Sequence, residues 1–224
     1  MSPALSHAPL VLPSVMSADM LRLGAQLDGL IAAGVRSAHV DVMDGHFVPN
    51  LTVGPDFAQA VSEPIHAAGG LVDVHLMVSR PAEMVGLFAP WADAITFHVE
   101  AEPHAHRLLG AIRDMGCRAG LAINPGTPVE HVAELAAQLD YVNVLAVNPG
   151  FAGQAFIPTT PDRINRLRAL LPETVVIEVD GGIGTATLPL AREAGATMFV
   201  SASSIFGAPD PVAAYAGLAA LAGA

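Results

Sequence analysis

A strand–helix unit that recurs eight times is the feature of this sequence that most constrains its fold. Short apolar segments typical of buried strands alternate with segments whose apolar residues have helical spacing, at intervals of roughly 25–30 residues. No linker, charge run or low-complexity segment divides these units. The predicted strands are Val11–Ser14, Ser37–Met43, Leu71–Met77, Ala94–His98, Arg118–Ile123, Tyr141–Val147, Val175–Val179 and Met198–Ser201.

Eight such units in 224 residues predict an α/β protein, a single (β/α)8 TIM barrel over residues 1–224. An open doubly wound sheet is the alternative, although no G-x-G-x-x-G follows the first strand, as a dinucleotide-binding sheet would require. One predicted helix begins near Pro55 and ends before the segment Glu63–Gly70. Another is indicated by the apolar stripe Val132–Leu139.

Charge excludes several classes of partner and mechanism. The formal net charge of −11 argues against nucleic acid and anionic membranes as partners. All ten basic residues are arginine, which excludes any mechanism that needs a Schiff-base lysine or a lysine acid or base. An anionic substrate is repelled at long range, so a phosphate site must be built locally from backbone N–H groups and helix N-termini.

The remaining composition indicates a cytoplasmic protein. Met1–Pro9 lacks the basic start and apolar block of a signal peptide, and no apolar run reaches the ~18 residues that cross a bilayer. The single cysteine, Cys117, allows no internal disulfide and fits a reducing compartment. We also expect a homo-oligomer, although an apolar barrel surface can pack in several symmetric ways.

The second predicted strand carries polar side chains on one face. Its strict alternation places His39, Asp41 and Met43 together, with Val40 and Val42 on the opposite face. A buried imidazole beside a carboxylate is costly unless something satisfies both groups. A divalent metal would do so, and a hydrogen-bonded structural pair is the alternative.

Barrel enzymes place their sites at the C-terminal ends of the strands. There the sequence brings together four residues of metal-ligand type from the second, third and seventh strands: His39, Asp41, His75 and Asp180. This set predicts one divalent ion (Zn, Mn, Fe or Co). His98 either supports a ligand or is a satisfied core histidine, and Met43 and Met77 either line a substrate pocket or fill the core.

Three glycine-rich or small-residue turns follow the last strands. They are Asn148–Gln154, Asp180–Gly182 and Ser201–Ser204, the last opening a short helix. Loops after strands seven and eight commonly bind phosphate in this fold, which predicts a phosphosugar as the small-molecule substrate. The reaction that these parts suggest is proton transfer alpha to a carbonyl, with the metal stabilising an enediolate and Asp41 and Asp180 as an acid/base pair.

The same residues resemble the ribulose-phosphate 3-epimerase family, and the similarity runs from about Val11 to Phe206. The matching blocks are Pro13–Asp19, His39–Asn50, Asp73–Met77, His98–Ala101, Val147–Phe151 and Glu178–Ile183. The resemblance implies a metal-dependent isomerase that interconverts ribulose 5-phosphate and xylulose 5-phosphate, an epimerase of carbohydrate metabolism in the pentose phosphate pathway.

The resemblance also implies residue roles. Asp41 and Asp180 would be catalytic, and both would bind metal together with His39 and His75. Ser14 would contact a substrate hydroxyl, and His75 is also implied to bind substrate. The implied phosphate contacts are Gly150, Phe151, Ala152, Gly153, Gly181, Gly182, Ala202 and Ser203.

Three departures from the family pattern bear on the substrate. Ala152 stands in the usual Gly-Phe-Gly-Gly turn, Ala202 replaces a glycine after the eighth strand, and Leu145 with Ala146 replaces a customary methionine. Allulose-6-phosphate 3-epimerase relatives carry Gly-Phe-Ala-Gly at that turn, so a six-carbon substrate is one alternative. A non-catalytic phosphosugar-binding barrel is the other.

Overall fold

The computed structural model describes residues 8–223. Eight parallel strands form its centre as one sheet. Their order in the sheet is β1-β8-β7-β6-β5-β4-β3-β2. A parallel bridge between Ser14 and His39 joins the two edges beyond the end of β1. The strands are β1 (Leu10–Pro13), β2 (Ser37–Met43), β3 (Leu71–Met77), β4 (Ala94–His98), β5 (Arg118–Ile123), β6 (Tyr141–Leu145), β7 (Val176–Asp180) and β8 (Met198–Ser201).

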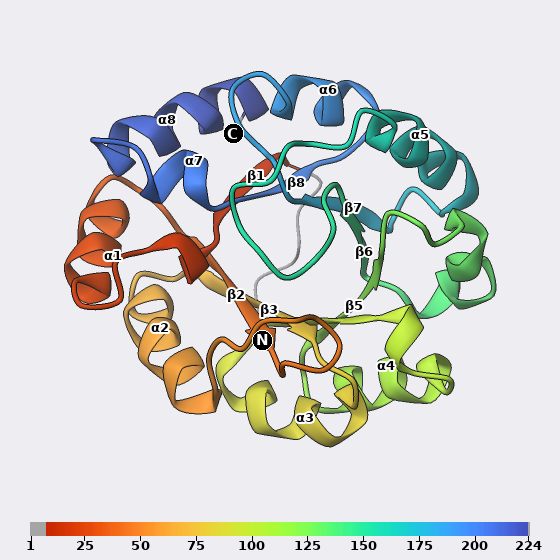
Figure 1. The fold of residues 1–224 in the computed structure, drawn as a ribbon. Helices are drawn as coiled ribbons and strands as arrows, with labels where there is room; N and C mark the ends of the chain where they lie inside the picture. The colour runs from red at the N-terminus through yellow and green to blue at the C-terminus, as the bar shows by residue number, and fades with distance from the viewer. Residues whose placement is uncertain (1–7, 224) are drawn as a thin grey trace.

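Helices surround this barrel on the outside, as Figure 1 shows. They are α1 (Leu23–Ala32), α2 (Pro55–Ala67), α3 (Pro81–Phe88), α4 (Ala105–Asp114), α5 (Thr160–Leu170), α6 (Leu188–Glu193), α7 (Ser203–Phe206) and α8 (Pro211–Ala222), with the 3₁₀ helices η1 (Val15–Ser17), η2 (Ala89–Trp91), η3 (Val99–Ala101) and η4 (Val129–Gln138). The single-domain (β/α)8 barrel is thus confirmed for the described residues. Within them, no helix combines the length and apolarity needed to cross a membrane.

Two predicted helices differ from the structure. The helix that begins at Pro55 continues through Pro64 to Ala67, because Ile65 is fully buried against the barrel and Pro64 removes only one backbone donor. The segment around Val132 is a 3₁₀ helix rather than an α-helix, and its buried Val129 and Val132 are three residues apart, the period of that helix.

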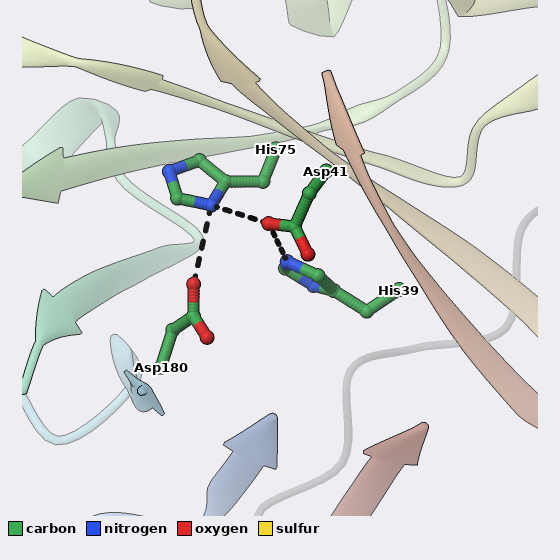
Figure 2. A group of neighbouring side chains, drawn as sticks. All are labelled: His39, Asp41, His75 and Asp180. Atoms are coloured by element: carbon green, nitrogen blue, oxygen red, sulfur yellow. Dashed lines mark hydrogen bonds and ion pairs between the residues drawn. The ribbon is translucent and has the colours of Figure 1, made fainter. Parts of the chain in front are cut away.

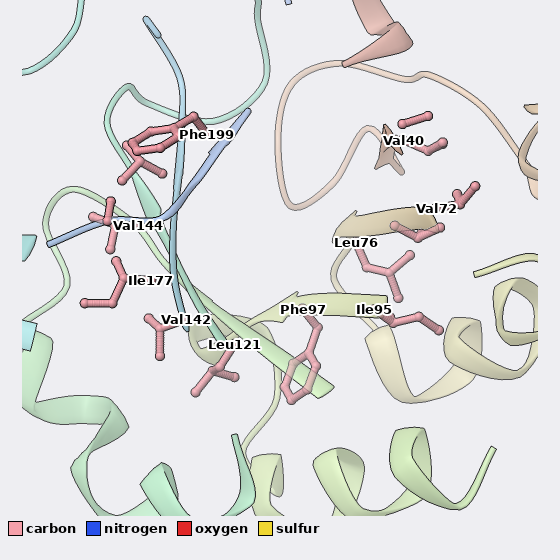
Figure 3. Packing of buried hydrophobic residues seen from close by; sticks show 14 of the residues in the cluster. Val40, Val72, Leu76, Ile95, Phe97, Leu121, Val142, Val144, Ile177 and Phe199 are labelled. Carbon is pink, nitrogen blue, oxygen red and sulfur yellow. The ribbon is translucent and has the colours of Figure 1, made fainter. Parts of the chain in front are cut away.

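The core has two parts because strand residues alternate in direction. Outward-facing apolar residues such as Val40, Val72 and Leu76 pack in the layer between sheet and helices, part of which Figure 3 shows. Inside the barrel, an apolar cluster that includes Leu12 and Met198 fills the end where the strands begin. Nearer the strand ends the inward residues include polar side chains, among them His39, Asp41 and His75, which form the site described next.

Candidate active site

A cavity opens at the C-terminal ends of the strands, on the face crossed by the loop between β6 and α5 (Figure 1). It encloses about 530 Å³ when the open space at its mouth is counted. The predicted site residues that line it are Ser14, Asp41, Met43, Met77, Gly150, Phe151, Ala152, Gly153, Asp180, Gly181, Gly182, Ala202 and Ser203. His39 and His75 lie beneath the floor, fully buried, and are not part of the lining.

Four side chains from β2, β3 and β7 converge at the floor of this cavity, as Figure 2 shows. Oδ1 of Asp41 lies 3.2 Å from Nε2 of His39 and 3.3 Å from Nδ1 of His75. The same Nδ1 lies 3.4 Å from Oδ2 of Asp180. The two carboxylates therefore approach one imidazole nitrogen from two different strands of the barrel.

The charges of these groups are strongly coupled. Burial acts to lower the pKa of His39 and His75, but the neighbouring carboxylates outweigh it and hold both pKa values above their ordinary range. Burial acts to raise the pKa of Asp41, yet the two histidines hold that pKa well below its usual value. Without a metal, the site therefore favours protonated imidazoles beside ionised carboxylate.

The donor set fits a divalent metal. Among residues 8–223, Nδ1 of His75 is buried without a hydrogen-bond partner, although two carboxylates lie 3.3 and 3.4 Å from it. One ligand atom from each of His39, Asp41, His75 and Asp180 lies within 4.8 Å of all the others. Two imidazoles and two carboxylates suit a borderline cation such as Zn²⁺, and a cation there would take over the role of the imidazole protons.

Asp73 holds His39 from the side away from the cavity, a contact that sequence reasoning did not assign. Its Oδ2 lies 2.7 Å from Nδ1 of His39, and its Oδ1 accepts a hydrogen bond of 2.6 Å from the Tyr141 hydroxyl. With Nδ1 engaged by this carboxylate, the free nitrogen of His39 is Nε2, which faces Asp41. The alternation that places Asp73 on the same face as His75 was the available signal.

Glu178 lies two residues before Asp180 on β7 and is fully buried near His39 and Asp73. Burial, reinforced by the charge of Asp73, raises the pKa of Glu178 well above its ordinary value. The raised pKa disfavours the ionised form of Glu178 that a metal would need, although Glu178 lies near His39 and Asp73. The cluster of His39, Asp41, His75 and Asp180 remains the candidate metal centre.

His98 lies directly behind His75. Its ring is fully buried, and its Nε2 is 2.9 Å from Nε2 of His75. Burial lowers the pKa of His98 to about 4, so the ring is neutral. Of the two interpretations of His98 offered by the sequence, the one in which it supports a ligand-type histidine fits the observed contact.

Ser14 and a group of methionines complete the floor and wall. The Ser14 hydroxyl donates a hydrogen bond of 2.6 Å to Oδ2 of Asp41, which leaves its oxygen able to accept one from a ligand. Met43 and Met77 both line the cavity and pack together, with Met16 partly buried against them. The sequence did not single out Met16.

The turns after β6, β7 and β8 form the opposite wall. A Cβ on Gly181 would lie 2.4 Å from Val147, and one on Gly182 would lie 2.8 Å from the backbone of Phe156, both at positive φ. These two positions therefore require glycine. In the loop after β6, the side-chain amide of Gln154 donates to the carbonyl of Phe151 at 2.8 Å, a brace that sequence reasoning missed.

Comparisons with known proteins agree with this geometry. A model of the ribulose-phosphate 3 epimerase family matches residues 10–206. The chain is 42% identical over 214 residues to ribulose-phosphate 3-epimerase 1 of Cupriavidus necator. The aligned region covers 92% of this chain and 88% of that protein. The chain is 45% identical over 201 residues to the ribulose-phosphate 3-epimerase of Rhodobacter capsulatus, covering 88% of this chain and 85% of that protein.

Among solved structures, a tryptophan synthase structure from Mycobacterium tuberculosis superposes with a TM-score of 0.72 at 17% identity, over 96% of this chain and 93% of that one. At that identity the likeness supports the barrel fold alone. The family match, by contrast, spans the whole barrel from β1 to α7 and includes every residue of the four-ligand cluster. The chain therefore belongs to the ribulose-phosphate 3-epimerase family.

Proposed function

We propose that this protein is an isomerase that inverts C3 of a ketose phosphate, converting D-ribulose 5-phosphate to D-xylulose 5-phosphate. The observation that carries the proposal is that two cavity-lining carboxylates from different strands, Asp41 of β2 and Asp180 of β7, lie 3.3 and 3.4 Å from Nδ1 of His75. Inversion needs one proton-transfer group on each face of the reacting carbon, and these two carboxylates supply such a pair.

His39, Asp41, His75 and Asp180 would hold one divalent cation, and the donor set accommodates Zn, Mn, Fe or Co. When bound, the cation would polarise the C2 carbonyl and offset the negative charge that develops on its oxygen. Asp73 orients His39 for this role, because its carboxylate occupies the other ring nitrogen.

The proton transfers are assigned to the two aspartates. One carboxylate removes the proton from C3, whose acidity comes from the adjacent C2 carbonyl, and leaves an enediol skeleton that is planar at C3. The other carboxyl group delivers a proton to the opposite face, which inverts the configuration. Ser14, which donates to Asp41, holds that carboxylate in place and offers its oxygen to a substrate hydroxyl.

Phosphate recognition is assigned to the wall formed by the turns after β6, β7 and β8. The net charge of −11 gives no long-range attraction for a phosphate, so local backbone N–H groups must bind it. The proposed contacts are Gly150, Phe151, Ala152, Gly153, Gly181, Gly182, Ala202 and Ser203. His75, implied as a further substrate contact, is separated from the cavity by its complete burial and is proposed as a ligand first.

Allulose 6-phosphate is the second candidate substrate, favoured by Ala152 in the turn that borders the cavity. The deciding experiment is a panel of five- and six-carbon ketose 5- and 6-phosphates, incubated with the metal-loaded protein and followed at C3 by NMR. A higher kcat/KM for ribulose 5-phosphate than for allulose 6-phosphate supports ribulose 5-phosphate as the substrate. Absence of C3 inversion in every substrate, with one metal bound per chain, would leave a non-catalytic phosphosugar-binding barrel.

We further infer that residues 1–224 act as one domain in a cytoplasmic homo-oligomer that binds no nucleic acid. The acidic net charge and single cysteine support the compartment and the lack of nucleic-acid binding. Exposed Leu21 and Leu51 support self-association, because they leave apolar surface uncovered. Light scattering at several protein concentrations tests this inference, and a monomer throughout would contradict it.

A further inference from the structure

A hydrogen-bonded chain runs from the candidate metal centre toward the surface behind His75. Nε2 of His75 lies 2.9 Å from Nε2 of His98, and Nδ1 of His98 lies 3.2 Å from Oε2 of Glu100. Both rings are fully buried, whereas the Glu100 side chain is 24% exposed. His98 ends β4 and Glu100 lies in η3, so one short segment carries both outer members of the chain.

The carboxylate of Glu100 accepts two further hydrogen bonds. Its Oε1 accepts hydrogen bonds from the backbone N–H of Asn124, at 2.9 Å, and from the hydroxyl of Thr127. Burial acts to raise the pKa of Glu100, but these bonds and the one from His98 outweigh it and hold the pKa at about 2. Glu100 is therefore an ionised group that can only accept hydrogen bonds.

When both imidazoles are neutral, as metal binding by His75 requires, only one arrangement of protons satisfies every contact in this chain. Because Glu100 only accepts, Nδ1 of His98 must carry a hydrogen. A neutral His98 then has a bare Nε2, so the hydrogen between the two rings must belong to Nε2 of His75. A neutral His75 with its hydrogen on Nε2 presents the lone pair of Nδ1 to Asp41 and Asp180, where the metal would lie.

We propose that His98 and Glu100 are positioning residues that fix the tautomer of His75 required for metal binding. Glu100 sets the tautomer of His98, and His98 sets that of His75. The tautomers of the two histidines are thus fixed in different ways. Asp73 contacts Nδ1 of His39 directly. Glu100 acts on Nε2 of His75 only through the imidazole of His98. The proposal rests on the proposed function in taking His75 as a ligand.

Zinc affinity of variants is the first test. In Glu100→Gln, an amide that donates to Nδ1 of His98 would move the His98 hydrogen to Nε2 and the His75 hydrogen to Nδ1, which blocks ligation. We expect zinc affinity, measured by competition with a chelator, to fall about 10- to 100-fold, the usual effect of removing such a partner. Glu102→Gln is the matched control, because Glu102 contacts the backbone of His104 and neither ring.

Substitution of His98 separates positioning from packing. His98→Leu removes the acceptor for Nε2 of His75, so we expect a loss of zinc affinity at least as large as that of Glu100→Gln. In His98→Gln the amide oxygen can accept the same hydrogen bond, so we expect most of the affinity to return. A merely structural role for His98 would not distinguish the two variants in this way.

The second test uses the unmodified protein and does not depend on variants that fold. In the zinc-loaded form, nitrogen-15 NMR of the imidazoles should show hydrogen on Nε2 of His75 and on Nδ1 of His98. Hydrogen on Nε2 of His98, or equal zinc affinity for Glu100→Gln and Glu102→Gln, would overturn the positioning role alone. Failure of the unmodified protein to bind zinc or the other candidate metals would overturn the proposed metal centre as well.

Discussion

Replacing Asp180 by Asn tests the two-base mechanism without changing the shape of the site. The Asn side chain keeps an oxygen near Nδ1 of His75, 3.4 Å away in the structure, but it cannot take or give a proton at C3. The backbone of residue 180 is unaffected, because its carbonyl accepts the N–H of Ala146 at 2.7 Å in either case. The substitution therefore removes proton transfer on one face while leaving the fold and one metal-capable oxygen in place.

The expected loss follows from the role assigned to this carboxylate. General acid–base catalysis contributes about 10²–10⁴ in rate, so Asp180→Asn should lose at least ~10²-fold in epimerisation, or about 2.7 kcal/mol in the barrier. Asp41 stays ionised and lines the same cavity, so it should still exchange the C3 hydrogen of whichever epimer presents that hydrogen to its face.

The assay is incubation of each epimer with the metal-loaded variant in deuterated water, followed by NMR at C3. The unmodified enzyme should place solvent deuterium at C3 of the product. The variant should exchange one epimer without inverting it and leave the other unexchanged. Near-normal epimerisation by metal-loaded Asp180→Asn would refute the assignment of Asp180 as a base and leave it, at most, a ligand.

Four further outcomes are expected. His75→Ala removes one ligand, so bound zinc and activity should fall together; full occupancy in elemental analysis would contradict the ligand set. Burial acts to lower the pKa of His39 and His75, but nearby carboxylates outweigh it and raise both pKa values above 6.5. Zinc must therefore displace protons, so zinc affinity should rise with pH by up to ~10-fold per pH unit for each proton released. A zinc affinity that does not change between pH 6 and 8 would contradict this. Ala202→Gly removes a methyl group at the cavity wall, so KM for the phosphosugar should fall with kcat nearly unchanged, and an unchanged or raised KM would show that the methyl does not impede binding. Gly182→Ala places a Cβ 2.8 Å from backbone at a positive φ, so urea denaturation should show a loss of ~1–3 kcal/mol, whereas Gly126→Ala, whose Cβ meets nothing within 4 Å, should cost far less.

Local sequence pattern was sufficient for most of the fold. Strand alternation depends only on neighbours along the chain, so the bounds of Ser37–Met43 and Leu71–Met77 agree with β2 and β3. Local pattern failed where tertiary packing decides. Pro64 normally ends a helix, but burial of Ile65 against the barrel continues α2 past it. The strand expected to reach Val147 ends at Leu145, where the chain turns into the loop over the cavity.

The candidate site divides in the same way. Sequence alone placed His39, Asp41, His75 and Asp180 at strand ends, and the rule that barrel sites lie at one end predicted that they meet, which the structure shows. Sequence pattern assigned no role to Asp73 or Glu100, because the role of each depends on which imidazole nitrogen it contacts. A sequence records the identity of a side chain and its position in a strand. The partner of each imidazole nitrogen, and hence its tautomer, depends on the register and curvature of neighbouring strands, and only the closed barrel determines those.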